Sequence, residues 1–82
     1  MAARSREHRA LGQAVRDLRA ERAMAQMALA NASGLDRTYV GGIERGERNP
    51  SYTSLRRIAL VFGIPVSEWM ARAEALERAG DS

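Results

Sequence analysis

Apolar and polar positions alternate with helical spacing along much of the chain. One stripe predicts a helix over about residues 6–22 with Ser5 as its N-cap, and its apolar positions are Leu11, Ala14, Val15 and Leu18. A second stripe predicts a helix that Ser51 or Thr53 caps and Gly63 ends, with apolar positions Leu55, Ile58, Ala59 and Phe62. Both patterns favour helices that bury one face.

Residues 26–45 have the features of two short helices joined by a tight turn. The first is expected over about residues 26–32, and Gly34 can adopt the positive φ that such a turn needs. Asp36 is a good N-cap for a second helix over about residues 37–45. Small or apolar residues stand where the two helices would touch: Ala30, Val40 and Ile43. This arrangement predicts a helix-turn-helix.

The last apolar stripe predicts a helix over about residues 66–78, with Ser67 as a candidate cap. Its members are Val66, Trp69, Met70, Ala73 and Leu76. Part of this stripe completes the core, and we expect the remainder to form a two-fold dimer interface. A fully intramolecular core is the alternative. The sequence thus predicts an all-α fold of five helices in a single domain over residues 1–82.

Composition narrows the range of functions. The chain has 82 residues, which suits one small domain, and it has no Cys that would form a disulfide or a thiolate site. Its net charge of +3 suits a polyanionic partner without demonstrating one. No apolar run reaches membrane-spanning length and the N-terminus lacks a signal-peptide pattern, so a cytoplasmic protein is expected. No enzyme, metal site or cofactor is predicted, because no nucleophile–base pair, metal cluster or phosphate loop is present.

Several motifs carry a family resemblance. These are Leu18-Arg19, Ile43-Glu-Arg-Gly46, Arg48-Asn-Pro-Ser51 and Leu60-Val-Phe-Gly-Ile-Pro-Val-Ser-Glu68. Residues 26–68 resemble the lambda-repressor/Cro-like, or XRE-type, helix-turn-helix regulators, and residues 35–46 are similar to the recognition segment of restriction–modification controller proteins. The resemblance implies a compact five-helix lambda-repressor-like domain. It also implies a structural salt bridge between Arg19 and Glu44.

The candidate DNA-contacting residues lie in and around the second helix of the motif. Arg37 and Thr38 stand at its N-terminal end, where Arg can read guanine and Thr can meet thymine. Arg37 is otherwise an exposed residue placed unfavourably at the positive end of the helix dipole. The controller-like pattern adds Arg48 as a base contact. Candidate backbone contacts are Gln26, Tyr39, Arg45, Asn49, Ser51 and Ser54.

Some of these positions have structural alternatives. Tyr39 could instead pack half-buried between helices, and Asn49 and Ser51 could simply cap the loop that carries them. Gly41 and Gly42 indicate that something approaches the helix backbone closely, either DNA or a neighbouring protein segment.

The leading hypothesis is a sequence-specific regulator that binds a pseudo-palindromic double-stranded operator as a homodimer, with RNA polymerase as a further candidate partner. Autoregulation of a restriction–modification operon is the preferred subclass. The alternatives are a DNA-binding antitoxin, a phage-type repressor, or a protein-interaction module that keeps the fold without reading DNA.

Overall fold

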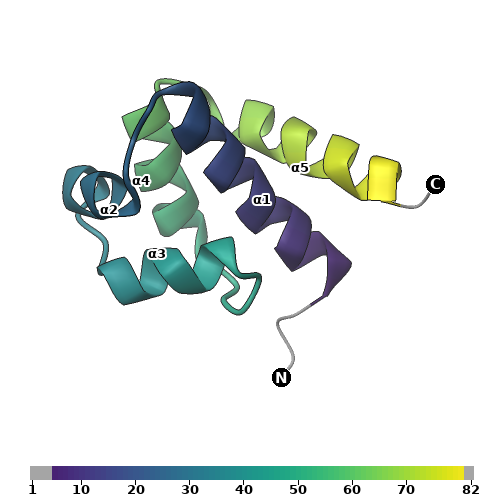
Figure 1. Ribbon diagram of the computed structural model, residues 1–82, viewed down its shortest axis with the longest axis horizontal. Coiled ribbons are helices and arrows are strands. Elements are labelled where there is room, and N and C mark those ends of the chain that lie inside the picture. The colour runs from purple at the N-terminus through teal and green to yellow at the C-terminus, as the bar shows by residue number, and fades with distance from the viewer. Residues whose placement is uncertain (1–4, 81–82) are drawn as a thin grey trace.

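The computed structural model describes residues 5–80, which contain five α-helices and no β-strand. The helices are α1 (Arg6–Glu21), α2 (Gln26–Ser33), α3 (Arg37–Glu44), α4 (Tyr52–Phe62) and α5 (Val66–Gly80). Helix α1 crosses the molecule between α3 and α5, and α2 is seen nearly end-on beside α3 (Figure 1). The predicted all-α fold is confirmed.

Short polar caps define where three of the helices begin. The side chains of Ser5, Asp36 and Ser51 accept hydrogen bonds from backbone N–H groups in the first turns of α1, α3 and α4. Ser51, rather than Thr53, is therefore the cap of α4. The predicted cap at Ser67 is wrong, because α5 already begins at Val66, directly after Pro65.

Glycines in the left-handed conformation end two helices. Gly34 has φ 74° after α2, and Gly63 has φ 73° after α4. Gly34 thus makes the tight turn that joins α2 to α3, as the sequence predicts. The connection from α1 to α2 contains a feature that the sequence did not indicate, since Ala23 has φ 50° without being glycine.

The core contains buried side chains from all five helices. Its largest fully buried side chains are Leu18, Leu29, Ile43, Ile58, Val15, Val40 and Trp69. Trp69 is fully buried, and its indole Nε1 donates a hydrogen bond to the Leu11 carbonyl oxygen at 3.2 Å. This bond joins α5 to α1 across most of the chain length and satisfies the one polar atom of the indole.

The burial of α5 corrects part of the predicted dimer interface. Trp69 is 0% exposed and Ala73 is 6% exposed within one chain, so neither has surface to offer a second copy. Val66, Met70 and Leu76 are partly buried against the same core. The stripe along α5 therefore serves mainly to attach α5 to α1.

Gly12 allows α1 to lie against the end of α3. A Cβ added at Gly12 would stand 2.3 Å from the Ile43 carbonyl oxygen and 2.5 Å from that of Glu44. Both atoms belong to backbone, which cannot rotate away as a side chain can. The contact fixes the C-terminal end of α3 against the middle of α1.

Candidate nucleic-acid interface

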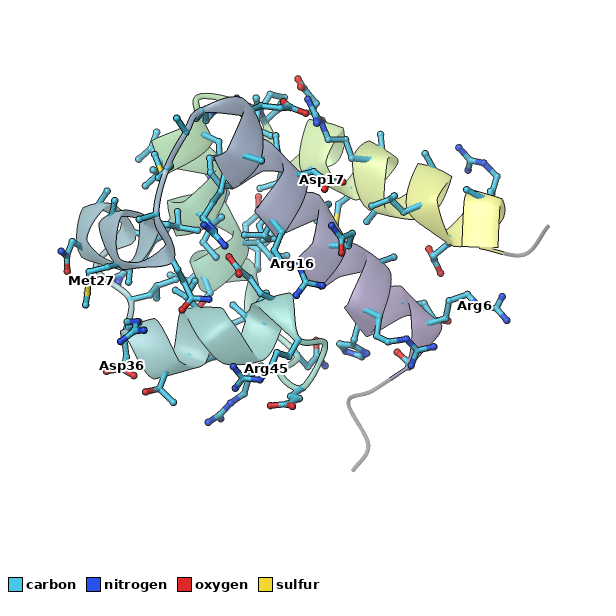
Figure 2. The ribbon with its side chains drawn as sticks, in the orientation of Figure 1. Arg6, Arg16, Asp17, Met27, Asp36 and Arg45 are labelled. Atoms are coloured by element: carbon cyan, nitrogen blue, oxygen red, sulfur yellow. The ribbon has the colours of Figure 1, made fainter. Side chains whose placement is uncertain are left out.

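The N-terminal end of α3 presents two exposed polar side chains. Arg37 and Thr38 are both exposed, and neither side chain forms a hydrogen bond within the described part of the protein that would hold it in another role. Asp36 caps this end by accepting a hydrogen bond from the Thr38 backbone N–H at 2.9 Å. Figure 2 shows Asp36 at this end of α3 and Arg45 at the other. The cap fixes the first turn of α3 while leaving the side chains that follow it accessible.

Arg48 belongs to the loop that follows α3, and its side chain reaches back over the helix. A Cβ at Gly42 would stand only 2.5 Å from Cγ of Arg48, so the aliphatic stem of Arg48 occupies the space above that glycine. The guanidinium carbon lies 6.0 Å from the centre of the Tyr39 ring, within range of a cation–π contact. Arg48 is thus held next to the exposed face of α3.

This arrangement answers two questions that the sequence left open. Tyr39 is half-buried, and its ring positions Arg48, so the packing alternative describes its surroundings within the chain. Gly42 is approached by a side chain of the same protein. At Gly41, an added Cβ would meet Arg45 Nη1 at 3.1 Å and Gln26 Oε1 at 3.6 Å. The Arg48 side chain therefore accounts for Gly42, whereas the neighbours of Gly41 are the ends of side chains that can shift.

A buried ion pair orients α3 on α1. Nε of Arg19 donates to one carboxylate oxygen of Glu44 at 2.7 Å, and Nη2 donates to the other at 2.9 Å. Glu44 is 3% exposed and Arg19 is 18% exposed, so the pair is largely out of water. The predicted salt bridge is present and is bidentate, the stronger form of this interaction. Loss of one partner would leave a buried charge, at a cost of about 3–5 kcal/mol.

Gln26 joins this ion pair. Its side-chain Nε2 donates to Oε1 of Glu44 at 3.0 Å, so the amide points towards α3. No side chain caps the N-terminus of α2, where Ala25 takes the capping position. The predicted phosphate contact at Gln26 would therefore come from the backbone N–H groups at that end and not from the side-chain amide, which bonds Glu44.

The remaining candidates, in and next to the loop after α3, differ in how exposed they are. Arg45 and Asn49 are exposed, and Arg45 forms an exposed ion pair with Glu47 at 3.1 Å. Ser51 is exposed as well, although it also caps α4. Ser54 is 7% exposed, and its hydroxyl accepts a hydrogen bond from Ser51 at 3.1 Å. Ser54 therefore belongs to the cap of α4 and does not lie on the outer surface.

The structure also reveals an apolar surface that the sequence analysis missed. Leu60 is 81% exposed and Tyr52 is 64% exposed, although both lie on α4. They border a hollow of about 510 Å³ together with Ile64, Val66 and two arginines. We call Tyr52, Leu60, Ile64 and Val66 the α4 patch. Tyr52 and Leu60 share one helical face beside the core stripe, but Arg56 lies between them on that face, so the sequence pattern gave only a weak signal.

Comparison with known proteins places this geometry among DNA-binding regulators. A helix-turn-helix family model matches residues 15–69, which include α2, α3 and α4. The immunity repressor of Bacillus phage phi105 is 40% identical over 57 residues, which cover 70% of this chain and 40% of the repressor. The control protein C.BamHI of Bacillus amyloliquefaciens is 41% identical over 54 residues, 65% of this chain and 67% of that protein. The chain thus spans less than half of the phage repressor.

Solved structures give the same picture. The restriction–modification controller protein C.AhdI from Aeromonas hydrophila has a TM-score of 0.73 and 43% identity, covering 74% of this chain and 92% of the controller. The controller C.Esp1396I, solved as a tetramer in complex with its natural 35-base-pair operator, has a TM-score of 0.79 and 30% identity. That match covers 89% of this chain and 96% of the controller. Both similarities extend over almost the whole length of these controllers.

Proposed function

The chain belongs to the helix-turn-helix family, and from this premise we propose that it is a sequence-specific DNA-binding transcription regulator of a restriction–modification operon. The observation that carries the proposal is the surface of α3. Arg37 and Thr38 are exposed at its N-terminal end, and Arg48 is held beside it by Gly42 and Tyr39. A protein-interaction module would not need these donors on one helix face.

In the proposed complex α3 enters the major groove with its N-terminal end towards the bases. Arg37 and Arg48 donate to acceptors on guanine, and the Thr38 methyl and hydroxyl contact the neighbouring base pair. Arg45, Asn49 and Ser51 donate to phosphates, and the uncapped N-terminus of α2 also receives a phosphate. The base contacts supply the preference for one DNA sequence, and the phosphate contacts set the position of the protein along the duplex.

The proposed regulator acts as a homodimer. The oligomer of C.Esp1396I on its operator supports a homo-oligomer. We place the two-fold contact on the α4 patch, because Leu60 and Tyr52 are large hydrophobic side chains that are mostly exposed in one chain. Val66 is the member of the predicted α5 interface that also borders this patch. Two copies of α3 related by a dyad would then read half-sites about one DNA turn, roughly 34 Å, apart.

A gel-shift titration against the DNA upstream of the protein's own gene tests the proposal. The titration would be run at two salt concentrations with random duplex as competitor. A complex that survives competitor and weakens steeply with salt supports a specific autoregulator. Equal affinity for random duplex would reject sequence-specific regulation at that site. No complex at low salt would reject DNA binding and favour the interaction module.

A phage-type repressor is the second candidate, and the similarity to the phi105 immunity repressor favours it. It would use the same α3 surface. The two candidates differ in the DNA that is bound, so the location of the chain's specific site beside a restriction–modification operon or in a prophage control region separates them.

A further inference from the structure

A basic groove extends beyond the residues assigned above to DNA contact and shares only Arg45 with them. It has a volume of about 440 Å³ and opens where α1 meets the end of α3 and the end of α5. The charged residues that line it are Arg6, Arg9, Arg16, Arg45, Glu44 and Glu77. Figure 2 shows Arg16 on α1 and Arg45 after α3, on two elements that are far apart in the sequence.

The charge balance of this groove is positive. Glu44 is already engaged by the guanidinium of Arg19 and by the amide of Gln26, so it offers little negative potential to a ligand. Glu77 is the other carboxylate among the lining residues, which also include four arginines. Arg45 shares its charge with Glu47, but this pair is exposed and screened by salt. The groove therefore suits an anion that presents several negative charges.

The arginines on α1 form a row. Arg9, Gln13 and Arg16 fall at i, i+4 and i+7, which places them on one helical face. Gln13 accepts a hydrogen bond from Arg16 at 2.9 Å and so orients that guanidinium. The row extends over roughly 10 Å of helix, whereas one DNA strand advances about 3.4 Å per phosphate along the duplex axis. A stretch of about three phosphates matches its length.

The row also continues the proposed phosphate-binding surface. A Cβ added at Gly41 would lie 3.1 Å from Nη1 of Arg45 and 3.6 Å from Oε1 of Gln26. These two side chains are therefore adjacent, and they join the start of α2 to the groove. The contact at Gly12 holds α1 on the end of α3, so the row keeps a fixed position relative to the helix that enters the major groove.

We propose that this α1 groove binds the phosphate strand that passes the N-terminus of α2, so that the footprint of the protein extends beyond the bases read by α3. The inference rests on the proposed function, since it takes its DNA position from α3. Arg9 and Arg16 on α1 and Arg45 after α3 make the contacts. These contacts strengthen binding without adding sequence preference.

The salt dependence of DNA affinity tests this inference. Wild type, Arg16→Ala and Arg9→Ala/Arg16→Ala would be titrated by fluorescence anisotropy on the specific duplex and on random duplex over a series of KCl concentrations. Each lost phosphate contact should reduce the slope of log affinity against log salt by about 0.9 per bound protomer. The ratio of specific to random affinity should stay unchanged. Arg78→Ala removes the same charge from an exposed site on α5 outside the groove and should leave the slope unchanged.

Each outcome gives a clear decision. A wild-type slope in the Arg16 variants, or an equal loss in Arg78→Ala, would overturn the groove as a phosphate site. A defect that appears only on DNA carrying two adjacent sites, and not on one site, would also overturn it by assigning the row to contacts between protein copies. If wild type shows no preference for the specific duplex but the slopes still fall, the groove binds phosphate and the proposed sequence-specific function fails.

Discussion

At the residue scale, glycines determine where the functional side chains lie. Gly42 leaves room for the stem of Arg48, and Gly12 leaves room for the backbone at the end of α3. Neither glycine adopts a positive φ, so backbone conformation does not explain them. The sequence showed that Gly41 and Gly42 needed an explanation, but it could not identify the neighbour. Gly12 gave no signal at all, because the atoms it meets lie about thirty residues away in the chain.

Gly12→Ala should destabilise the protein by about 1–3 kcal/mol, since the new methyl group overlaps backbone oxygens that must move with α3. Urea denaturation followed by circular dichroism measures this change. Gly80→Ala is the matched control, because nothing lies within 4 Å of a Cβ there. Equal midpoints for wild type and Gly12→Ala would show that α1 and α3 separate at little cost.

Arg37→Ala should weaken binding to the specific site by about 1–3 kcal/mol and relax the preference at one base pair. Arg37 is exposed, so the stability of the free protein should not change. Competition binding with single-base variants of the site provides the measurement. Unchanged affinity together with an unchanged base preference would remove Arg37 from the readout.

At the element scale, the ends of the helices were predictable and the burial of α5 was not. Ser5, Asp36 and Gly34 act on residues beside them in sequence, so their roles follow from local rules. The position of Trp69 depends on how α5 lies against α1, which no local pattern specifies. Its hydrogen-bond partner, the Leu11 carbonyl, stands on a helix at the opposite end of the chain. An apolar stripe alone therefore could not divide core from interface.

A surface ion pair makes the attachment of α5 to α1 dependent on pH. Arg72 donates two hydrogen bonds to the Glu21 carboxylate, at 2.5 Å and 3.0 Å. These bonds, with the positive charges of Arg72 and Arg22, lower the pKa of Glu21 from its ordinary 4.5. The pair therefore stabilises the fold above the ordinary pKa of Glu21. This contribution is lost as the pH falls through the lowered value.

Arg72→Ala should accordingly be less stable than wild type at pH 7, and the difference should disappear as the pH falls below about 4.5. Urea midpoints at a series of pH values measure the effect. Glu21→Gln in the Arg72→Ala background should cause little further loss. A difference that stays constant down to pH 2 would mean that Arg72 acts through packing and not through this carboxylate.

At the scale of the whole molecule, two surfaces have separate proposed tasks. The face of α3 carries the exposed polar donors, and the α4 patch carries exposed apolar side chains. Ser54 is buried by the cap of α4 and the Gln26 amide bonds Glu44, so these two predicted side chains do not take part in the first surface as expected. The sequence predicted the other residues of this surface, and their contact with DNA stays a prediction. It did not predict the second surface, because the long apolar side chains of α5 were the stronger signal. Trp69→Ala would be a poor test of dimerisation, since loss of a core tryptophan should cost about 3–5 kcal/mol of monomer stability.

Leu60→Ser should weaken dimerisation without affecting the fold, because Leu60 is 81% exposed in one chain. Two copies of Leu60 would each lose about 1.5 kcal/mol or more of burial, so the dimer would lose about 3 kcal/mol, which corresponds to a rise of about a hundredfold or more in the dimer Kd. Sedimentation equilibrium measures it. Met27→Ser, at another exposed apolar side chain that is 50% exposed on α2, is the control. A dimer of wild-type strength in Leu60→Ser would reject the α4 patch as the interface.

The bonds around Glu44 have a mechanical consequence. The Glu44 carboxylate on α3 accepts hydrogen bonds from Arg19 on α1 and from Gln26 on α2. Because one group joins the three helices, they have no hinge between them. The unit formed by α1, α2 and α3 is therefore stiff and cannot adapt to a half-site that is displaced or rotated. The duplex must supply the compliance, at an elastic cost that depends on the flexibility of the base steps between the half-sites. Sequences that no side chain touches would then influence which operators are occupied.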